Sequence, residues 1–518
     1  MSVGLIIEKL FEHDILITPA QAKLITENDT LVLRNLLKFP KEAEAYLRRL
    51  EERATAQPVK PTIQPTVVIK QLSPKSGNYN IVANPEFRDP SPPSVEIVRN
   101  YVRKPKKRSY QDFVQHFIVR FQKVSAILRT RKELANILPL DKLKKTGNAN
   151  EAIAAIGLVS EKRETKNEHI ILTIEDRTGS INILCSKNKA DLLAMAQDIH
   201  VDDVIGVTGK LGEDIIFADS LVLPDVPLQH ELKKSPDEAY AVCVSDIHMG
   251  NKNFMAKEFE QFLSWLRGES GSAHAREIAK KTHYVIIPGD IIEGVGIYPN
   301  QENDLAIMDI YDQYKYCEEI LLGIPADKHV IIIPGNHDIG RISEPQPRLP
   351  KDVMPRLAER PNTYFLSNPS TVRIHEQPGF PGFTILLYHG GSFIRYGNDV
   401  PRLFKEGGVN NPGAIMQYLM QRRHLAPAHG STLYVPDIEE DQLVIDEVPD
   451  YLITGHLHMA QERTWRGITM LSCSCWVPIT DYQQKQGLKC DPGKLVLMNL
   501  QTREVQMLTP EDLLSEDA

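Results

Sequence analysis

Five short motifs in the second half of the chain decide how its largest domain folds: Ser245-Asp-Ile-His-Met-Gly250, Gly289-Asp-Ile-Ile-Glu-Gly294, Gly335-Asn-His-Asp338, Tyr388-His-Gly-Gly391 and Gly455-His-Leu-His458. Each motif ends a short apolar run, and the runs read AYAVCV, HYVIIP, HVIIIP, FTILLY and DYLIT. Runs of this length, rich in β-branched and aromatic residues, are typical of buried strands. The sequence therefore predicts five buried strands that each end in a polar cluster, as in a site built on a rigid sheet.

The polar residues of these motifs are metal-ligand types. Carboxylate, amide and imidazole groups without cysteine suit a pair of Mn²⁺, Fe or Zn²⁺ ions better than a structural zinc. Any one motif alone is more typical of a turn or a helix cap. The five in this order predict a metal centre with seven ligands, namely Asp246, His248, Asp290, Asn336, His389, His456 and His458.

The order D-x-H, GD, GNH[DE], H and GH-x-H closely resembles the calcineurin-like metallophosphoesterase superfamily. The resemblance implies an α/β fold of four layers, two packed sheets flanked by helices, with two divalent ions in its site. Mn²⁺ is the expected metal, with Fe or Zn²⁺ as alternatives. The resemblance assigns Asp246, His248 and His458 to one ion and Asn336, His389 and His456 to the other, with Asp290 bridging. Two such ions clamp the phosphoryl oxygens of an in-line displacement.

The same resemblance leaves His337 without a metal. His337 lies beside a ligand and is followed by Asp338, which we expect to orient its ring. His337 is therefore the expected general acid for the leaving oxygen, and the expected reaction is phosphoester hydrolysis. Protein Ser/Thr phosphatases of the superfamily carry Asp-Arg-Gly after the second motif and Glu after Asn-His. This chain has Glu293-Gly294-Val295 and Asp338 instead, which disfavours a protein phosphatase.

Length and composition are those of a soluble multidomain protein. A chain of 518 residues has room for about three domains. It contains no long uncharged apolar run and no basic start of a signal peptide, so we expect no membrane segment and a cytoplasmic location. The six cysteines include no C-x-x-C pair, so neither a disulfide framework nor a zinc ribbon is indicated.

Charge is distributed unevenly along the chain. The formal net charge is −8, yet residues 99–145 hold fourteen Lys or Arg and three acids, a local balance of +11 that leaves −19 elsewhere. Such segregation is expected when one surface faces a polyanion such as DNA. A solvated basic linker is the alternative interpretation.

The sequence divides into five segments. Residues 1–53 predict an all-α module, either a docking site for other replication proteins or a structural cap, and residues 54–111 a proline-rich and basic linker. Residues 112–230 read as short strands, starting with DFVQHFIVRFQKVSAIL, with one helix before the last pair. They resemble an OB-fold, a β-barrel that binds nucleic acid or docks proteins. The phosphoesterase domain is expected at 236–508, and an acidic tail at 509–518.

A longer excursion between His389 and His456 contains the helical stretch NPGAIMQYLMQRRHLAP. Three residues late in this stretch are candidates for contact with a DNA backbone near the metals, namely Arg422, Arg423 and His424. The alternative is a purely structural role, because basic residues at a helix C-terminus favour the macrodipole.

The order of helical module, linker, OB-fold and intact five-motif domain resembles the small subunits of archaeal family-D DNA polymerases. The related eukaryotic polymerase B-subunits share the arrangement with degraded metal motifs, whereas every ligand is present here. The resemblance implies a 3′→5′ exonuclease that proofreads DNA, and a separate large catalytic subunit as partner. Two alternatives stay open. A repair nuclease of the superfamily would carry its motifs near the N-terminus, and a non-catalytic scaffold would not need intact ligands.

Overall fold

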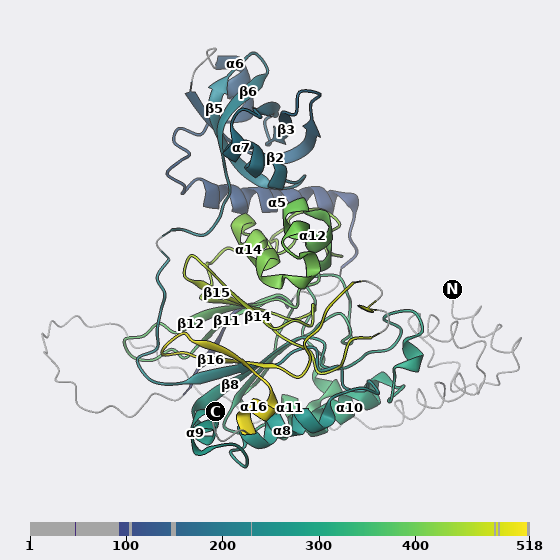
Figure 1. Ribbon diagram of the computed structural model, residues 1–518. Helices are drawn as coiled ribbons and strands as arrows, with labels where there is room; N and C mark the ends of the chain where they lie inside the picture. The colour runs from purple at the N-terminus through teal and green to yellow at the C-terminus, as the bar shows by residue number, and fades with distance from the viewer. Residues whose placement is uncertain are drawn as a thin grey trace, which may run out of the picture. The chain divides into compact units, whose positions relative to one another are not determined.

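The computed structural model describes Leu47 and residues 93–102, 106–146, 152–228, 230–480, 483–484 and 487–514. The chain divides into two compact units, Met1–Phe87 and Arg88–Ala518. The predicted helical module of residues 1–53 and most of the predicted linker therefore lie outside the described residues. The second unit contains a β-barrel and a larger domain of two sheets with helices (Figure 1).

The barrel is closed by five strands in the order β2-β3-β4-β6-β5. Its strands are β2 (Ala152–Glu164), β3 (Ile170–Glu175), β4 (Ser180–Cys185), β5 (Val204–Leu211) and β6 (Ile215–Val222), and α7 (Ala190–Asp198) lies between β4 and β5. Burial along β3 and β4 alternates residue by residue, as expected where one face fills a barrel. The predicted OB-fold, with one helix before its last two strands, is confirmed.

The prediction of a strand in DFVQHFIVRFQKVSAIL is wrong, because this segment forms helix α5 (Tyr110–Leu128). Its buried residues His116, Arg120, Val124 and Leu128 recur every four positions, which is a helical and not a strand period. Ser109 and Asp112 form a capping box that starts the helix. Helix α6 (Leu140–Thr146) follows, so the barrel begins at Ala152 and not near residue 112.

The two sheets of the larger domain have six strands each, in the orders β10-β9-β8-β7-β16-β17 and β1-β11-β12-β13-β15-β14. The first contains β7 (Tyr240–Cys243), β8 (Thr282–Pro288), β9 (His329–Ile333), β10 (Thr363–Phe365), β16 (Leu495–Asn499) and β17 (Val505–Leu508). The second contains β1 (Val95–Asn100), β11 (Ser370–Ile374), β12 (Phe383–Leu387), β13 (Tyr451–Thr454), β14 (Gln461–Trp465) and β15 (Ile468–Ser472). The five predicted motif-bearing strands are confirmed as β7, β8, β9, β12 and β13.

One hydrophobic core lies between the sheets and two more lie under the helices. The middle core joins residues of both sheets, among them Ile286, Ile331, Ile385 and Ile453. The outer face of the β7–β10 sheet is covered by α8 (Ala256–Leu266), α9 (Ala273–Lys281), α10 (Ile310–Leu321) and α11 (Pro355–Ala358) (Figure 1). The outer face of the other sheet packs against α12 (Phe393–Asp399), α13 (Pro401–Lys405) and α14 (Pro412–Arg422). No described helix has both the length and the apolar character needed to cross a membrane.

Two boundary predictions need correction. Val95–Asn100, inside the predicted linker, is strand β1, which pairs antiparallel with β11 at the edge of its sheet. Its VEIVRN sequence is short, and the proline-rich and basic residues on either side favour the interpretation as a linker. The predicted acidic tail begins with α16 (Pro510–Leu514), because Leu513 is buried and anchors it to the domain.

Candidate metal centre

The topology brings the five motifs to one place. β7, β8 and β9 are parallel neighbours in one sheet, and β12 and β13 are parallel neighbours in the other, so their carboxyl ends lie together within each sheet. Two pairs join the sheets: His458 Nε2 lies 3.3 Å from Asp246 Oδ1, and His389 Nε2 lies 3.3 Å from Asp290 Oδ2. The site is therefore shared between the two sheets.

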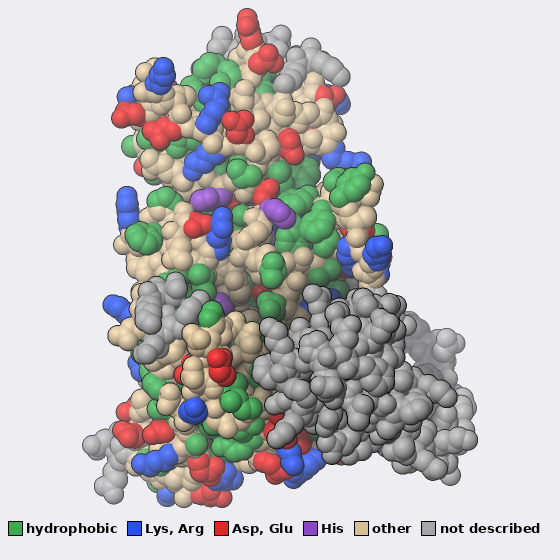
Figure 2. Space-filling model, turned by 90° about the vertical axis from the view of Figure 1, so that its right-hand side faces the viewer, with side chains coloured by type: hydrophobic (Ala, Val, Ile, Leu, Met, Phe, Trp, Pro, Cys, Tyr) green, Lys and Arg blue, Asp and Glu red, His purple; other side chains and the backbone are tan. Residues whose placement is uncertain are grey.

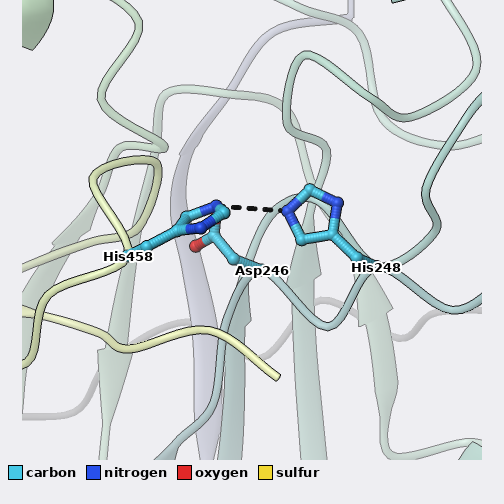
Figure 3. A group of neighbouring side chains, drawn as sticks. All are labelled: Asp246, His248 and His458. Atoms are coloured by element: carbon cyan, nitrogen blue, oxygen red, sulfur yellow. Dashed lines mark hydrogen bonds and ion pairs between the residues drawn. The ribbon is translucent and has the colours of Figure 1, made fainter. Parts of the chain in front are cut away.

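The first group of candidate ligands is Asp246, His248 and His458 (Figure 3). One ligand atom from each lies within 4.8 Å of the other two, and all three side chains are buried. The two imidazoles point toward one another, with 3.2 Å between their Nε2 atoms (Figure 3). These are the three residues predicted to hold one ion.

The second group is Asp290, His389 and His456, whose ligand atoms also lie within 4.8 Å of one another. Asn336 joins this group, because its Oδ1 lies 3.1 Å from His389 Nε2. The structure thus brings together all seven side chains that the sequence predicts as ligands.

The backbone at this site is strained. Five of the seven residues have positive φ angles, namely Asp246 (50°), His248 (54°), Asp290 (50°), His456 (71°) and His458 (58°). Side chains other than glycine rarely adopt this left-handed region, and residues that do so cluster at functional sites. Their concentration here is independent evidence that the site is functional.

Two glycines leave room for the carboxylates. A Cβ at Gly335 would collide with Oδ1 of Asp290, and a Cβ at Gly455 would come 2.5 Å from Oδ2 of Asp246. The glycine in GNHD and the first glycine in GHLH therefore allow the loops to approach the buried acids.

The electrostatics of the site favour added positive charge. Burial opposes protonation of His248, but the nearby Glu293 carboxylate raises its pKa to about 9. Burial likewise opposes protonation of His389, and Asp290 raises its pKa to about 10. Burial would raise the pKa of Asp290, yet His389 and His337 hold it well below its usual range. A divalent cation would satisfy the same buried acids, so the donor set and its charge fit a metal site.

His337 has a different environment from the one that the sequence predicts. Its Nδ1 lies 2.6 Å from the carbonyl oxygen of Glu293, and its backbone N–H donates to Oδ1 of Asp290 at 2.8 Å. Asp338 does not orient the ring, because its carboxylate instead accepts from the backbone N–H of Gly335 at 2.8 Å. That part of the prediction is wrong, since the turn directs the Asp338 side chain back onto its own loop.

Glu293 is the residue that sequence reasoning missed. Its Oε2 lies 3.0 Å from His248 Nδ1, while its Oε1 accepts hydrogen bonds from Tyr298 and Gln301, both at 2.9 Å. The residue thus supports a candidate ligand through its carboxylate and His337 through its carbonyl. The sequence signal that could have identified Glu293 is its position inside the second motif, Gly289-Asp-Ile-Ile-Glu-Gly294.

Arg422, Arg423 and His424 lie away from solvent, so the prediction that they contact DNA is not supported. All three are buried. Arg422 Nε pairs with Asp203 of the barrel at 3.1 Å, Arg423 Nε donates to the Ile445 carbonyl at 2.8 Å, and His424 Nε2 lies 3.0 Å from Asp441. Their role is structural, since they hold the excursion to neighbouring elements.

Part of the basic segment of residues 99–145 is also neutralised internally. Arg120 pairs with Asp441 at 2.8 Å and Lys123 with Asp446 at 2.6 Å. On the part of the face of Figure 2 that is not covered in grey, basic and acidic side chains are interspersed and form no broad basic patch. Two of the fourteen basic side chains of this segment are thus paired with acids of the larger domain.

Comparison with known proteins identifies the class to which this arrangement of barrel and two-sheet domain belongs. The family model for the B-subunits of DNA polymerases alpha and epsilon matches residues 241–464, and the OB-fold nucleic acid binding domain matches residues 154–223. The two-sheet domain thus resembles polymerase B-subunits, and the barrel resembles OB-folds that bind nucleic acid.

The chain is also similar over most of its length to archaeal proteins named DNA polymerase II small subunit. The chain is 36% identical to that of Archaeoglobus fulgidus, over 75% of each chain. It is 35% identical to that of Methanocaldococcus jannaschii, over 75% of this chain and 64% of the relative, and 33% identical to that of Pyrococcus abyssi, over 80% and 69%. The chain belongs to the archaeal DNA polymerase II (family D) small-subunit family.

Proposed function

We propose that this chain is a dimetal 3′→5′ exodeoxyribonuclease that proofreads for a heteromeric DNA polymerase. The proposal rests on the convergence of seven side chains of metal-ligand type at the ends of five strands. Five of these seven residues have a left-handed backbone conformation. We assign the larger domain to the calcineurin-like metallophosphoesterases, whose motifs these strands carry. An intact, strained and buried ligand set supports activity over a purely scaffolding role.

The chain's own groups take distinct parts in the proposed reaction. Asp246, His248 and His458 would hold one divalent ion, and Asn336, His389 and His456 a second, with Asp290 between them. Two such ions, with Mn²⁺ as the expected metal, would activate water and stabilise charge on the phosphoryl oxygens. His337 lines the same cavity, and its Nδ1–H donates to the Glu293 carbonyl, so Nε2 would give a proton to the leaving sugar oxygen when the ring is in its imidazolium form.

The proposed partners are a large catalytic subunit and DNA. The relatives' name, small subunit, describes one chain of a complex. A stable interface of standard size buries roughly 800 Å² on each partner. The barrel and the two-sheet domain are the described parts with enough folded surface for it, so we place the scaffolding role there.

The test is degradation of single-stranded DNA by the purified full chain loaded with Mn²⁺. A 3′-end label should be released at once as a mononucleotide, while a 5′-end label should give a ladder of shortening products. Asp290→Ala should lower the rate to below a tenth of the wild-type rate, because it removes the shared carboxylate. Asp219→Ala, which changes an exposed acid of the barrel, is the matched control.

Each negative result would contradict a different part of the proposed function. Activity of Asp290→Ala above a tenth of wild type would contradict the ligand assignment. A metal-loaded wild-type chain that cleaves no DNA would support the non-catalytic scaffold, and release of the 5′ label first would reverse the polarity.

A further inference from the structure

The cavity above the candidate ligands has a polar floor and apolar walls. Its volume is about 210 Å³, and its floor includes His248, Asp290, Asn336, His456 and His458. Four aliphatic side chains form much of its walls, namely Ile297, Ile394, Val477 and Leu488. They come from separate segments of the chain, so the apolar wall is assembled by the fold.

Ile394 is the most exposed of these wall residues. It lies on α12, where its neighbours Phe393 and Tyr396 are buried in the core while Ile394 is 41% exposed. A single exposed isoleucine needs no explanation by itself. This one lines the same cavity as the candidate metal ligands, and an apolar ligand group would cover it.

Size limits what the cavity can take. Small-molecule sites usually measure roughly 300 to 1,000 Å³. A cavity of about 210 Å³ therefore has room for part of one nucleotide but not for a base pair.

The charges of the residues that line the cavity limit how a nucleotide can be bound there. The described residues that line the cavity include no Lys or Arg. Among these described residues, phosphates beyond the reacting one find no cationic partner, and the neutral side chains Asn251, Tyr298, Thr480 and Gln483 and the apolar walls are left to contact a bound nucleotide. Apolar contact with the face of a base tolerates any sequence, because every base has such a face.

We propose that Ile297, Ile394 and Leu488 form a contact surface for the base of the terminal nucleotide, so that the site receives one unstacked nucleotide and recognises its base by apolar contact. This inference rests on the proposed nuclease function and adds residues that determine its specificity. The three side chains act by binding and take no part in proton transfer.

The experiment compares single-stranded DNA with a normal 3′-terminal nucleotide and the same strand with an abasic 3′-terminal nucleotide. For the full wild-type chain with Mn²⁺, kcat/KM for the first cleavage should be about tenfold higher for the strand with the normal 3′-terminal nucleotide. A factor of about ten is the smallest effect usually seen when an apolar contact with a substrate is lost. Ile394→Ala should lose most of this preference by slowing cleavage of the normal end alone. Leu433→Ala, an exposed aliphatic that does not line the cavity, should keep it.

A second variant guards against misfolding. Ile297→Ala changes another wall residue and should lower the same ratio. Equal wild-type rates on the two ends, or full preference retained by both Ile297→Ala and Ile394→Ala, would overturn the inference.

One further substrate separates this inference from the proposed function. The wild-type chain should hydrolyse bis(4-nitrophenyl) phosphate, which needs the metal floor and has no nucleobase. Hydrolysis of the ester without a preference for the normal DNA end would overturn only the base-contact surface. Failure on both the ester and DNA would overturn the nuclease function and this inference with it.

Discussion

His337 shows how a single ring can be prepared for one proton transfer. Since the Glu293 carbonyl can only accept, the 2.6 Å contact requires that Nδ1 of His337 carries a hydrogen. Nε2 of the neutral ring is then an acceptor on the side of Asp290, 4.0 Å from its Oδ2, and it can donate to a group in the cavity once it has taken up a proton. The tautomer follows from the backbone of the second motif and not from Asp338.

We expect His337→Ala to damage cleavage of DNA far more than cleavage of a nitrophenyl phosphodiester. A sugar 3′-oxygen is a strongly basic leaving group and needs a proton, whereas nitrophenolate leaves without one. General acid help is worth about 10² to 10⁴ in rate. The measurement is the ratio of the two rates, together with metal content, which should stay near that of wild type.

Asn336→Ala is the control for this prediction, because Asn336 is assigned to a metal and lies beside His337 in the sequence. It should lower metal content and both activities together. If His337→Ala slowed both substrates equally with metals retained, His337 would position the phosphate instead, and the acid would have to be another group.

Glu293→Gln should weaken metal binding without touching a predicted ligand. The Glu293 carboxylate lies 3.0 Å from His248 Nδ1, so it fixes the ring with Nε2 toward the first metal group. Loss of such a supporting carboxylate typically costs about 10- to 100-fold in metal affinity or activity. Titration of the metal-free variant with Mn²⁺ measures the affinity. Glu302→Gln, an exposed acid of the same loop, should bind like wild type, and an unchanged affinity in Glu293→Gln would refute its supporting role.

At the scale of elements, α5 shows where sequence reasoning fails and why. The helix carries apolar residues on its exposed face too, among them Tyr110, Phe113 and Val114, so its sequence reads as a β-rich run without a polar side. Its buried side instead includes His116 and Arg120, which the sequence would place in solvent. Burial of those two depends on Asp441, more than three hundred residues away, and no local pattern reveals that partner.

The motif strands were predictable for the opposite reason. Each is a short, almost fully buried run followed within three residues by its ligands, so the signal is local and complete within about ten residues. The sequence also identified which side chains meet, because the motif order is specific. It did not identify Glu293, whose role depends on the conformation of the loop after β8.

The cluster around Asp441 should make the attachment of α5 sensitive to acid. His424 Nε2 lies 3.0 Å from Asp441, and its Nδ1 accepts from the Ala426 N–H at 2.9 Å, so the neutral ring is fully satisfied. Burial, and then the positive charge of Arg120, lower the pKa of His424 to about 4. Burial also lowers the pKa of His116, which faces the same carboxylate.

Because the unfolded ring titrates near pH 6.5, the stability from neutral His424 is complete above that pH and is lost as the pH falls toward 4. Asp441 stays ionised throughout, since Arg120 and His424 hold its pKa well below its usual range despite burial. We expect the free energy of unfolding to fall by about 2 kcal/mol between pH 7.5 and 5 on this account. Urea unfolding at the two pH values measures it.

His424→Gln removes the titrating ring and should flatten much of this pH dependence, with His116 accounting for the remainder. His274→Gln, which changes an exposed histidine of α9, is the control. A His424→Gln chain that lost stability with acid as steeply as wild type would show that the sensitivity arises elsewhere.

At the scale of the whole molecule, the barrel and the two-sheet domain are joined by one buried and one partly exposed ion pair. Arg422 pairs with Asp203 at 3.1 Å, and Arg402 pairs with Asp198 on the barrel's helix. Removing one partner of a buried pair is costly because it leaves the other charge unpaired. Of the three residues expected to touch DNA, Arg422 thus joins the excursion to the barrel, whereas Arg423 and His424 bind within the excursion.

Strand β1 determines how many N-terminal residues can be deleted before stabilising contacts are lost. It completes the edge of its sheet, and its Arg99 reaches the excursion with hydrogen bonds to Gln442 Oε1 at 2.9 Å, Val444 O at 2.7 Å and Asp441 O at 2.9 Å. Deleting residues 1–92 removes none of these contacts. Deleting residues 1–101 removes all of them and exposes the β11 edge.

We therefore expect the chain without residues 1–92 to keep its metal content, its nuclease activity and its complex with the large subunit. The chain without residues 1–101 should be less stable by roughly 3 kcal/mol, from the three Arg99 hydrogen bonds alone at about 1 kcal/mol each. Co-purification with the large subunit and thermal unfolding of the two truncated chains decide the matter. If the shorter deletion released the large subunit, the N-terminal unit would be its anchor, and equal stability of the two chains would mean that β1 contributes nothing to the fold.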